Sequence, residues 1–208
     1  MRFRRVQFSG PAVVVAFDIC SSSNIIEELT LNGDLRRWRD FLKTLKRYLA
    51  KAQDKVLFDP YKFTGDGWIL LFPPGTDGNL LSEFLHDLCN FFAVEFRRTV
   101  LPFLANPPNI MGVTFGIEKG PIDHMTMYQQ PEYIGRAINI ACRLQNAVKD
   151  SGGSPAYKAL VSNAVFTEYF SAAKLHKVFR VRRTLRNINH GADYRCRKIE
   201  LFRRGSAP

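Results

Sequence analysis

The feature that most constrains the fold is an uninterrupted apolar run from Ala12 to Phe17, which ends directly at the acidic residue Asp18. The run is far shorter than the roughly 20 residues that cross a membrane. It therefore predicts a central, buried strand of a sheet. The segment before it, Met1 to Arg5, is basic, but the apolar run is too short for a signal-peptide core. We expect a cytoplasmic protein.

The rest of the chain mixes helix and strand patterns without strict alternation. A hairpin of residues 56–63 and 68–72 is expected around Gly65-Asp66-Gly67, with further strands at 111–117 and 125–128 and one or two C-terminal hairpins. Helices are expected at 25–52, broken near Asn32-Gly33-Asp34, and at 80–101, 135–148 and 164–170. These patterns predict an α+β fold: one domain over residues 1–208, with a core of about 11–202 and helices packed against one mostly antiparallel sheet.

The balance of charged residues favours an anionic partner. The net charge is +11, which suits nucleic acid, a nucleoside triphosphate or phospholipid headgroups. Solvated strand faces explain the same excess equally well. Much of it lies near the C-terminus, at Arg180, Arg182, Arg183, Arg186, Arg195, Arg197, Lys198, Arg203 and Arg204.

Cysteine and histidine spacing argues against two classes of site. The four cysteines include no CxxC pair, and the four histidines show no paired spacing. A zinc site and a disulfide framework are therefore both disfavoured, and a reducing compartment is the simpler interpretation.

Two acidic residues lie where apolar strands end. Asp18 closes the first strand, and Asp66 lies at the tip of the expected hairpin. A carboxylate beside a buried strand costs free energy unless it is paired or binds a metal, and two such oxygen ligands suit Mg²⁺ or Mn²⁺. Taken singly, Asp66-Gly67 is also typical of a type I′ turn, and Asp18 could cap a helix.

A second polar group lies in the segment from Glu132 to Arg143. On a helix that starts near Gly135, Asn139 and Arg143 are four residues apart and share one face. The guanidinium of an arginine offers a fork of donors to phosphate, so the pair suits an anionic transition state. A solvated polar helix face is the alternative for such a spacing.

Taken together and in order, these segments resemble the class III adenylate and guanylate cyclase family. Phe17-Asp18-Ile19 is similar to its first metal motif, and Lys62-Phe63-Thr64-Gly65-Asp66 to its K-x-x-G-D segment. Two further matches are Gly112 to Gly120, which resembles a G-I-x-x-G strand, and Glu132 to Leu144, which resembles D-x-x-G-x-x-V-N-x-A-x-R-L.

The resemblance implies a cyclase-type domain and a role for each matching residue. Asp18, Asp66 and the Ile19 carbonyl would hold two divalent ions, Mn²⁺ or Mg²⁺. Asn139 would orient the ribose, and Arg143 would stabilise charge on the phosphates. The remaining positions would bind the substrate: Lys62 and Glu132 the base, and Arg186 of Leu185-Arg186-Asn187-Ile188 the phosphates, where the family has lysine. The family also implies a head-to-tail homodimer with shared active sites.

The identity of the base stays open at this stage. Lys62 only donates hydrogen bonds and an ionised Glu132 only accepts them, which excludes none of the four bases. A closer resemblance, over Phe17 to Ser22, Tyr61 to Phe72 and Glu132 to Arg136, is to compact bacterial pyrimidine cyclases of Pycsar anti-phage systems. It implies cyclic UMP or cyclic CMP as product, with UTP favoured over CTP.

The same resemblance implies a separate effector protein that senses the product, and neither a membrane nor a nucleic acid is expected to be required. Three alternatives remain. The chain could be an adenylate cyclase of the same family, a catalytically inactive cyclase fold, or a basic nucleic-acid-binding domain.

Overall fold

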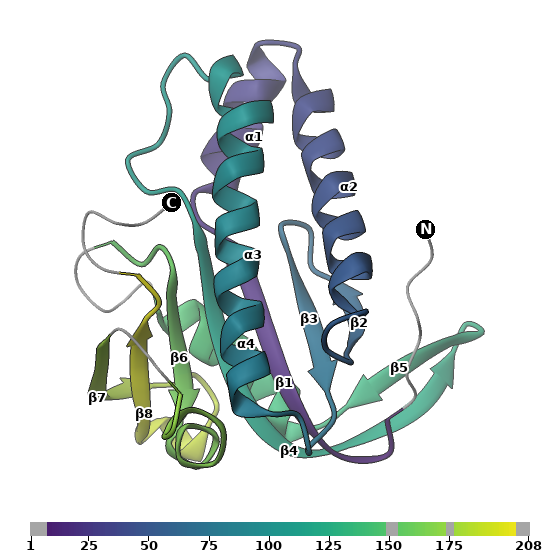
Figure 1. Cartoon of the computed structure of the whole chain (residues 1–208), viewed down its shortest axis with the longest axis vertical. Helices are drawn as coiled ribbons and strands as arrows, with labels where there is room; N and C mark the ends of the chain where they lie inside the picture. Colours follow the sequence, from purple (N-terminus) through teal and green to yellow (C-terminus); the bar gives the residue numbers. More distant parts are fainter. Residues whose placement is uncertain (1–7, 149–153, 174–176, 203–208) are drawn as a thin grey trace.

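The architecture is one sheet with helices on both faces (Figure 1). A computed structural model describes residues 8–148, 154–173 and 177–202. The strand order is β2-β3-β1-β4-β6-β8-β7, with β5 paired to β4, and every pairing is antiparallel except β4 with β6. This confirms the predicted α+β fold. The strands are β1 (Gly10–Ile19), β2 (Asp59–Phe63), β3 (Gly67–Phe72), β4 (Val113–Met127), β5 (Gln130–Ile134), β6 (Lys158–Ser162), β7 (Lys177–Thr184) and β8 (Asp193–Glu200).

Four long helices cover the sheet. They are α1 (Ser22–Leu31), α2 (Leu35–Ala52), α3 (Gly78–Thr99) and α4 (Arg136–Ala147). Shorter turns are η1 (Leu101–Phe103), α5 (Asn163–Val165), η2 (Phe166–Phe170) and η3 (Asn189–Gly191). The expected break between α1 and α2 is confirmed, with Gly33 in the left-handed region at φ 73°. In the described part of the chain, no helix combines the length and the apolar character needed to cross a bilayer.

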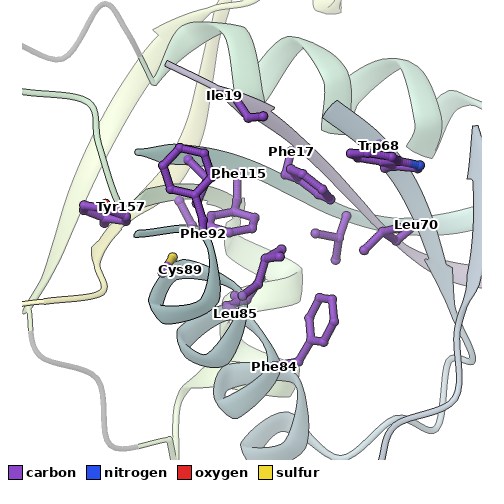
Figure 2. Packing of buried hydrophobic residues seen from close by; sticks show 14 of the residues in the cluster. Phe17, Ile19, Trp68, Leu70, Phe84, Leu85, Cys89, Phe92, Phe115 and Tyr157 are labelled. Atoms are coloured by element: carbon purple, nitrogen blue, oxygen red, sulfur yellow. The ribbon is translucent and has the colours of Figure 1, made fainter. Parts of the chain in front are cut away.

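The face covered by α1, α2 and α3 holds the main core. Alternate residues of β1, including Phe17 and Ile19, point into it and belong to the same buried cluster as Phe92 and Leu85 of α3 (Figure 2). Phe92 also contacts Phe41 of α2, with ring centroids 5.6 Å apart. Each such side chain contributes about 1.5–3 kcal/mol on full burial, so this face supplies most of the stability.

On the opposite face, small residues of β1 and β4 lie under α4 and let that helix approach the sheet closely. Ala16 of β1 and Ala141 of α4 are both buried there. At Gly116 of β4, a Cβ atom would lie 2.0 Å from the carbonyl oxygen of Ala141 and 2.2 Å from the backbone nitrogen of Gln145. Only glycine therefore fits at position 116, and this contact fixes the height of α4 above the sheet.

Three details of the predicted elements need correction. Strand β2 begins at Asp59 rather than at residue 56, because the N–H of Val56 donates to the carbonyl of Ala52 (3.1 Å) and closes the end of α2. The strands expected at 111–117 and 125–128 form the single long strand β4. Pro121 is tolerated within it because β6 accompanies β4 only from Thr114 to Ile117, so the missing N–H interrupts no ladder with β6.

The third correction concerns a strand that the sequence pattern did not indicate. Strand β6 lies parallel to β4 and carries the short apolar stretch from Ala159 to Val161. A run of this length does not distinguish a strand from a buried turn of helix. Its pairing with β4 and β8 decides the matter.

Candidate active site

Strand pairing brings the two predicted metal ligands together. Asp18 of β1 pairs with Gly67 of β3, the residue that follows Asp66. A Cβ atom at Gly67 would lie 1.9 Å from the carbonyl oxygen of Phe17, so glycine is needed for the two strands to approach this closely. Both carboxylates are half-buried at the same end of the sheet.

The turn that carries Asp66 is held by a serine. Gly65 has φ 105° whereas Asp66 has no positive φ, which is the pattern of a type II′ turn rather than type I′. The hydroxyl of Ser22, the first residue of α1, donates a short hydrogen bond to Oδ2 of Asp66. Ser22 is not among the predicted site residues. A run of serines at the start of a helix, as at Ser21 to Ser23, is typical of an N-cap, yet Ser21 makes no side-chain cap bond and donates to the carbonyl of Ile110 (2.8 Å).

The donors at this end of the sheet fit a magnesium-type ion. Asp18 and Asp66 supply hard carboxylate oxygens, and the side chain of Ile19 is buried in the core, so this residue could contribute only its backbone carbonyl. Within the described residues, no group of three or more His, Cys, Asp or Glu side chains could hold a metal. Mg²⁺ is nevertheless commonly held by one or two carboxylates together with substrate phosphates.

The two predicted base-binding residues form an ion pair. Nζ of Lys62 on β2 lies 3.1 Å from Oε2 of Glu132 on β5. The hydroxyl of Tyr61 donates to the same oxygen at 2.6 Å and accepts the N–H of Tyr133 at 3.1 Å. The hydrogen bond from Tyr61, and then the ammonium of Lys62, lower the pKa of Glu132.

Like Ser22, Tyr61 lies within a segment that carries the sequence resemblance, but no role was predicted for it. Desolvation, and then its hydrogen bond to Glu132, raise its pKa to about 12, so it stays a donor at neutral pH. Both donors bind Oε2 of Glu132, and Oε1 has no hydrogen bond to any residue that the structure describes. An ionised acceptor at Oε1 and a donor at Lys62, which is 52% exposed, thus lie side by side. Together they could bind the edge of a base.

Helix α4 presents the predicted catalytic pair as expected from its spacing. Asn139 is exposed and lines a pocket of about 640 Å³ together with Pro121, Ile122 and Asn187. Arg143 lies one turn further along and is half-buried. In the part of the chain that the structure describes, its buried Nε has no hydrogen-bond partner. A buried donor of this kind costs free energy unless a ligand or a second chain satisfies it.

The loop after β7, which carries Arg186, packs against α4. Leu185 and Ile188 are buried against Ile140 and Leu144 of α4. Arg186 between them is exposed, and the adjacent Asn187 lines the same pocket as Asn139.

The end of the sheet that carries Asp18 and Asp66 is called the metal end below. Within one chain, the metal end and the Asn139 pocket are at opposite ends of β1. Pro121, which lines that pocket, pairs with Pro11, whereas Asp18 pairs with Thr114. Pro11 and Asp18 are seven positions apart on the strand, a span of about 23 Å. The predicted metal ligands and the residues of the Asn139 pocket therefore form two separate groups within a chain.

Comparison with known proteins places the fold. No family model matches the sequence. No curated protein sequence matches it either. Solved structures match over nearly the whole chain. The adenylyl cyclase CyaB from P. aeruginosa is 16% identical, with 94% of this chain and 96% of that chain covered and a TM-score of 0.67.

Two other matches have the same character. An adenylate cyclase from Trypanosoma brucei is 17% identical, with 91% of this chain and 89% of that chain covered and a TM-score of 0.64. The guanylate cyclase domain of RhGC from Catenaria anguillulae, in complex with GTP, is 12% identical, with 95% and 100% covered and a TM-score of 0.56. The chain has the nucleotidyl cyclase fold. At these identities the likeness establishes the fold and leaves the activity to the chemistry of the site.

Proposed function

We propose that this protein is a metal-dependent nucleotidyl cyclase that closes a nucleoside triphosphate into its 3′,5′-cyclic nucleotide and releases pyrophosphate. The observation that carries the proposal is the pairing of Asp18 with Gly67, which brings Asp18 next to the turn that carries Asp66 where β1 ends. The cyclase fold supports it, as does the placement of Lys62 with Glu132 and of Asn139 with Arg143.

The reaction requires positioning and charge stabilisation more than covalent chemistry by the protein. The ribose 3′-oxygen attacks the α-phosphorus, the bond from that phosphorus to the bridging oxygen of pyrophosphate breaks, and the 3′-hydroxyl proton leaves to solvent. Two divalent ions held by Asp18, Asp66 and the Ile19 carbonyl would supply Lewis-acid activation and charge neutralisation. Asn139 would hold the ribose, and Arg143 and Arg186 would donate hydrogen bonds to phosphate oxygens.

The ion pair at Lys62 supports binding of the base but accommodates more than one. With cytosine or adenine, Lys62 would donate to a ring nitrogen and Glu132 would accept from the exocyclic amine. With uracil or guanine, Lys62 would donate to a carbonyl and Glu132 would accept from the ring N–H. We propose a pyrimidine, with UTP favoured over CTP, because the sequence segments around Asp18, Lys62 and Glu132 resemble Pycsar cyclases. The cyclic product would then be a second messenger in anti-phage defence, sensed by a separate effector. Adenylate cyclase activity is the alternative, favoured by the structural likeness to adenylyl cyclases.

A direct assay tests the activity and the base together. The purified protein would be incubated with Mn²⁺ and each of the four triphosphates, and the products identified by mass. We expect cyclic UMP or cyclic CMP in excess of the purine products, and none after addition of a chelator. Cyclic AMP as the main product would overturn the pyrimidine assignment alone. No cyclic product from any triphosphate would overturn the cyclase proposal.

The separation of the two groups of residues supports a shared active site. A triphosphate bound to Asp18 and Asp66 of one chain is at the wrong end of β1 to meet the Asn139 pocket of the same chain. A head-to-tail homodimer with two-fold symmetry would bring the metal end of each subunit to α4 of the other, which makes two equivalent active sites.

Complementation tests this arrangement. Asp66→Ala and Asn139→Ala, each inactive alone, would be mixed under conditions in which subunits exchange. Each mixed dimer carries one doubly damaged site and one intact site, so random pairing should restore about a quarter of the wild-type activity. A mixture that stays inactive although exchange has been demonstrated rules out the shared site.

A further inference from the structure

Two segments of the fold are strongly basic: helix α2, and the β7–β8 hairpin at the side of the sheet away from β2 and β3 (Figure 1). The hairpin differs from α2 in that its charge is mostly arginine and lies on paired strands. From Lys177 to Glu200 the sequence has eight lysines and arginines against two acidic residues, so this segment holds more than half of the net charge of +11. Six of the eight are arginines. A guanidinium binds phosphate through two parallel hydrogen bonds, which an ammonium cannot do.

Strand register gathers four of these arginines on one face. Arg180 lies directly opposite Arg197, and Arg182 directly opposite Arg195. Because alternate residues of a strand share a face, the four form one patch, here called the arginine face. The intervening Val181 and Cys196 pack on the α4 side of the sheet. The arginine face is therefore on the other side of the sheet from α4 and its candidate catalytic residues.

The arrangement is electrostatically unfavourable in the isolated chain. Like charges directly opposite each other destabilise a strand pair. Arg182 lies 3.8 Å from the exposed carboxylate of Asp193, and Nε of Arg197 donates to the neutral amide of Asn163 at 3.1 Å. Arg180 and Arg195 have no ion pair with any residue that the structure describes. The face thus keeps most of its positive charge.

Protection of a sheet edge does not account for this pattern. Charged residues on an edge strand discourage pairing with other chains, and β7 is the edge strand here. Arg195 and Arg197, however, lie on β8, which is paired on both sides by β6 and β7. Their position opposite the arginines of β7 doubles the number of positive charges on this face, but it does not protect an edge strand from pairing with another chain.

We propose that the arginine face is a binding site for the phosphodiester backbone of a nucleic acid. Opposed guanidiniums that repel each other in the free protein become favourable when phosphates lie between them. Among the described residues of the hairpin there is no exposed large hydrophobic side chain to enter a lipid layer, which favours nucleic acid over a membrane. The inference does not depend on the proposed cyclase activity, which needs no nucleic acid.

The test measures binding of fluorescein-labelled single-stranded RNA, and of DNA of the same sequence, by fluorescence anisotropy at several salt concentrations. The variant is Arg180→Gln/Arg182→Gln/Arg195→Gln, which changes three exposed side chains and spares the packed Arg197. The control is Arg36→Gln/Arg39→Gln/Lys43→Gln, which removes the same charge from exposed positions of α2. We expect the variant to bind at least about tenfold more weakly, with a salt slope reduced by about 2, and the control to bind like the wild type.

Three other outcomes would overturn the proposal. Equal weakening in the variant and the control would show that binding follows net charge alone. Absence of binding to both RNA and DNA at physiological salt would show that the face has no such ligand. Vesicles containing phosphatidylserine provide a further arm: binding to vesicles but not to nucleic acid, lost in the variant, would make the face a membrane site. Stronger binding to RNA than to DNA, or the reverse, would identify the natural source of the phosphodiester.

Discussion

The two faces of the central sheet are built from different residues and serve different purposes. On β1, the side chains that point toward α1, α2 and α3 are large, as at Phe17 and Ile19. Those that point toward α4 are smaller, with Ala12 and Ala16 on either side of Val14, and that series ends at Asp18. Large side chains interlock and supply hydrophobic free energy. Small ones let the backbone of a helix approach closely.

This difference separates stability from chemistry. Loss of an aromatic ring from the face under α3 should lower the free energy of unfolding. The other face sets the position of α4 and ends at the two carboxylates. The candidate catalytic residues all lie on α4 or at strand ends and turns, where they bury little area. Substitutions on the two faces should therefore change different measured quantities.

The largest expected effect is on turnover, at the metal end. Asp66→Ala should lower kcat by more than about 1000-fold, because the divalent ions lose a carboxylate ligand. The melting temperature should hardly change, since the side chain is half-buried in a turn. Asp66→Asn is the matched control for shape, because it can still accept from Ser22 and lacks only the charge. It should be nearly as inactive, and substantial turnover by either variant would contradict the metal assignment.

On the face covered by α1, α2 and α3, a substitution should lower stability and leave turnover nearly unchanged. Phe92→Ala should cost about 3–5 kcal/mol of stability, the usual price of a cavity left by a buried phenylalanine. The melting temperature should fall by roughly 10 °C in a domain of this size. At a temperature where the protein is folded, kcat should be close to that of the wild type. Chemical denaturation and steady-state kinetics on the same sample check both statements, and a large loss of kcat would break the proposed separation of the faces.

A substitution between the sheet and α4 should affect both quantities. Gly116→Ala puts a methyl group 2.0 Å from the carbonyl oxygen of Ala141, so α4 must move away from the sheet. We expect a loss of about 1–3 kcal/mol and a lower kcat, because Asn139 and Arg143 move with the helix. Gly75→Ala is the matched control, since its Cβ would meet nothing within 4 Å. That control should stay within about 0.5 kcal/mol of the wild type.

Selection of the base should respond to Lys62. Lys62→Ala removes one hydrogen-bonded contact to the base, which should lower kcat/KM for the preferred triphosphate by about tenfold. The ratio of this kcat/KM to the values for the other three triphosphates should fall as well. The melting temperature should change little, because Lys62 is exposed. Competition among the four triphosphates in one reaction measures the ratios directly. Unchanged ratios would move base recognition to Tyr61 or to the shape of the pocket.

The smallest effect concerns pH and the Tyr61 hydroxyl. Its hydrogen bond is the main cause of the lowered pKa of Glu132, so Tyr61→Phe should raise that pKa toward its usual range. The ionised form of Glu132 persists only above its pKa, and the acid limb of kcat/KM should therefore move to higher pH. A pH profile of both proteins with the preferred triphosphate checks the direction of the shift. If the acid limb of kcat/KM lies at the same pH in both proteins, ionisation of Glu132 does not control substrate binding.

Much of the fold could be predicted from local pattern. The apolar run at 12–17, the helix break at Gly33 and the hairpin around Asp66 all gave the right element, because each depends on hydrophobic periodicity or on turn residues within a few positions. Strand β6 was missed and β4 was divided in two. Those errors arose where pairing with a distant strand, rather than local preference, decides the conformation.

The site shows the same division. The motifs indicated Asp18, Asp66, Lys62, Glu132 and Asn139 as functional candidates. The structure brings Asp18 next to the turn of Asp66, pairs Lys62 with Glu132, and places Asn139 at a separate pocket. The motifs implied no role for Ser22 or Tyr61, whose hydroxyls bind the carboxylates of Asp66 and Glu132 across 44 and 71 residues of sequence. A hydroxyl beside a motif has no distinguishing pattern until the fold supplies its partner.

By itself, the sequence determined which residues are chemically capable and which segments form strands and helices, since both follow from side-chain type and short-range spacing. Only the tertiary structure decided that Asp18 lies next to the turn of Asp66, that the Asn139 pocket is at the far end of β1, and that arginines of β7 and β8 face one another. These relations depend on register and on the close approach of backbones at Gly67 and Gly116. Register is set by the packing of whole faces, which no local stretch of sequence contains.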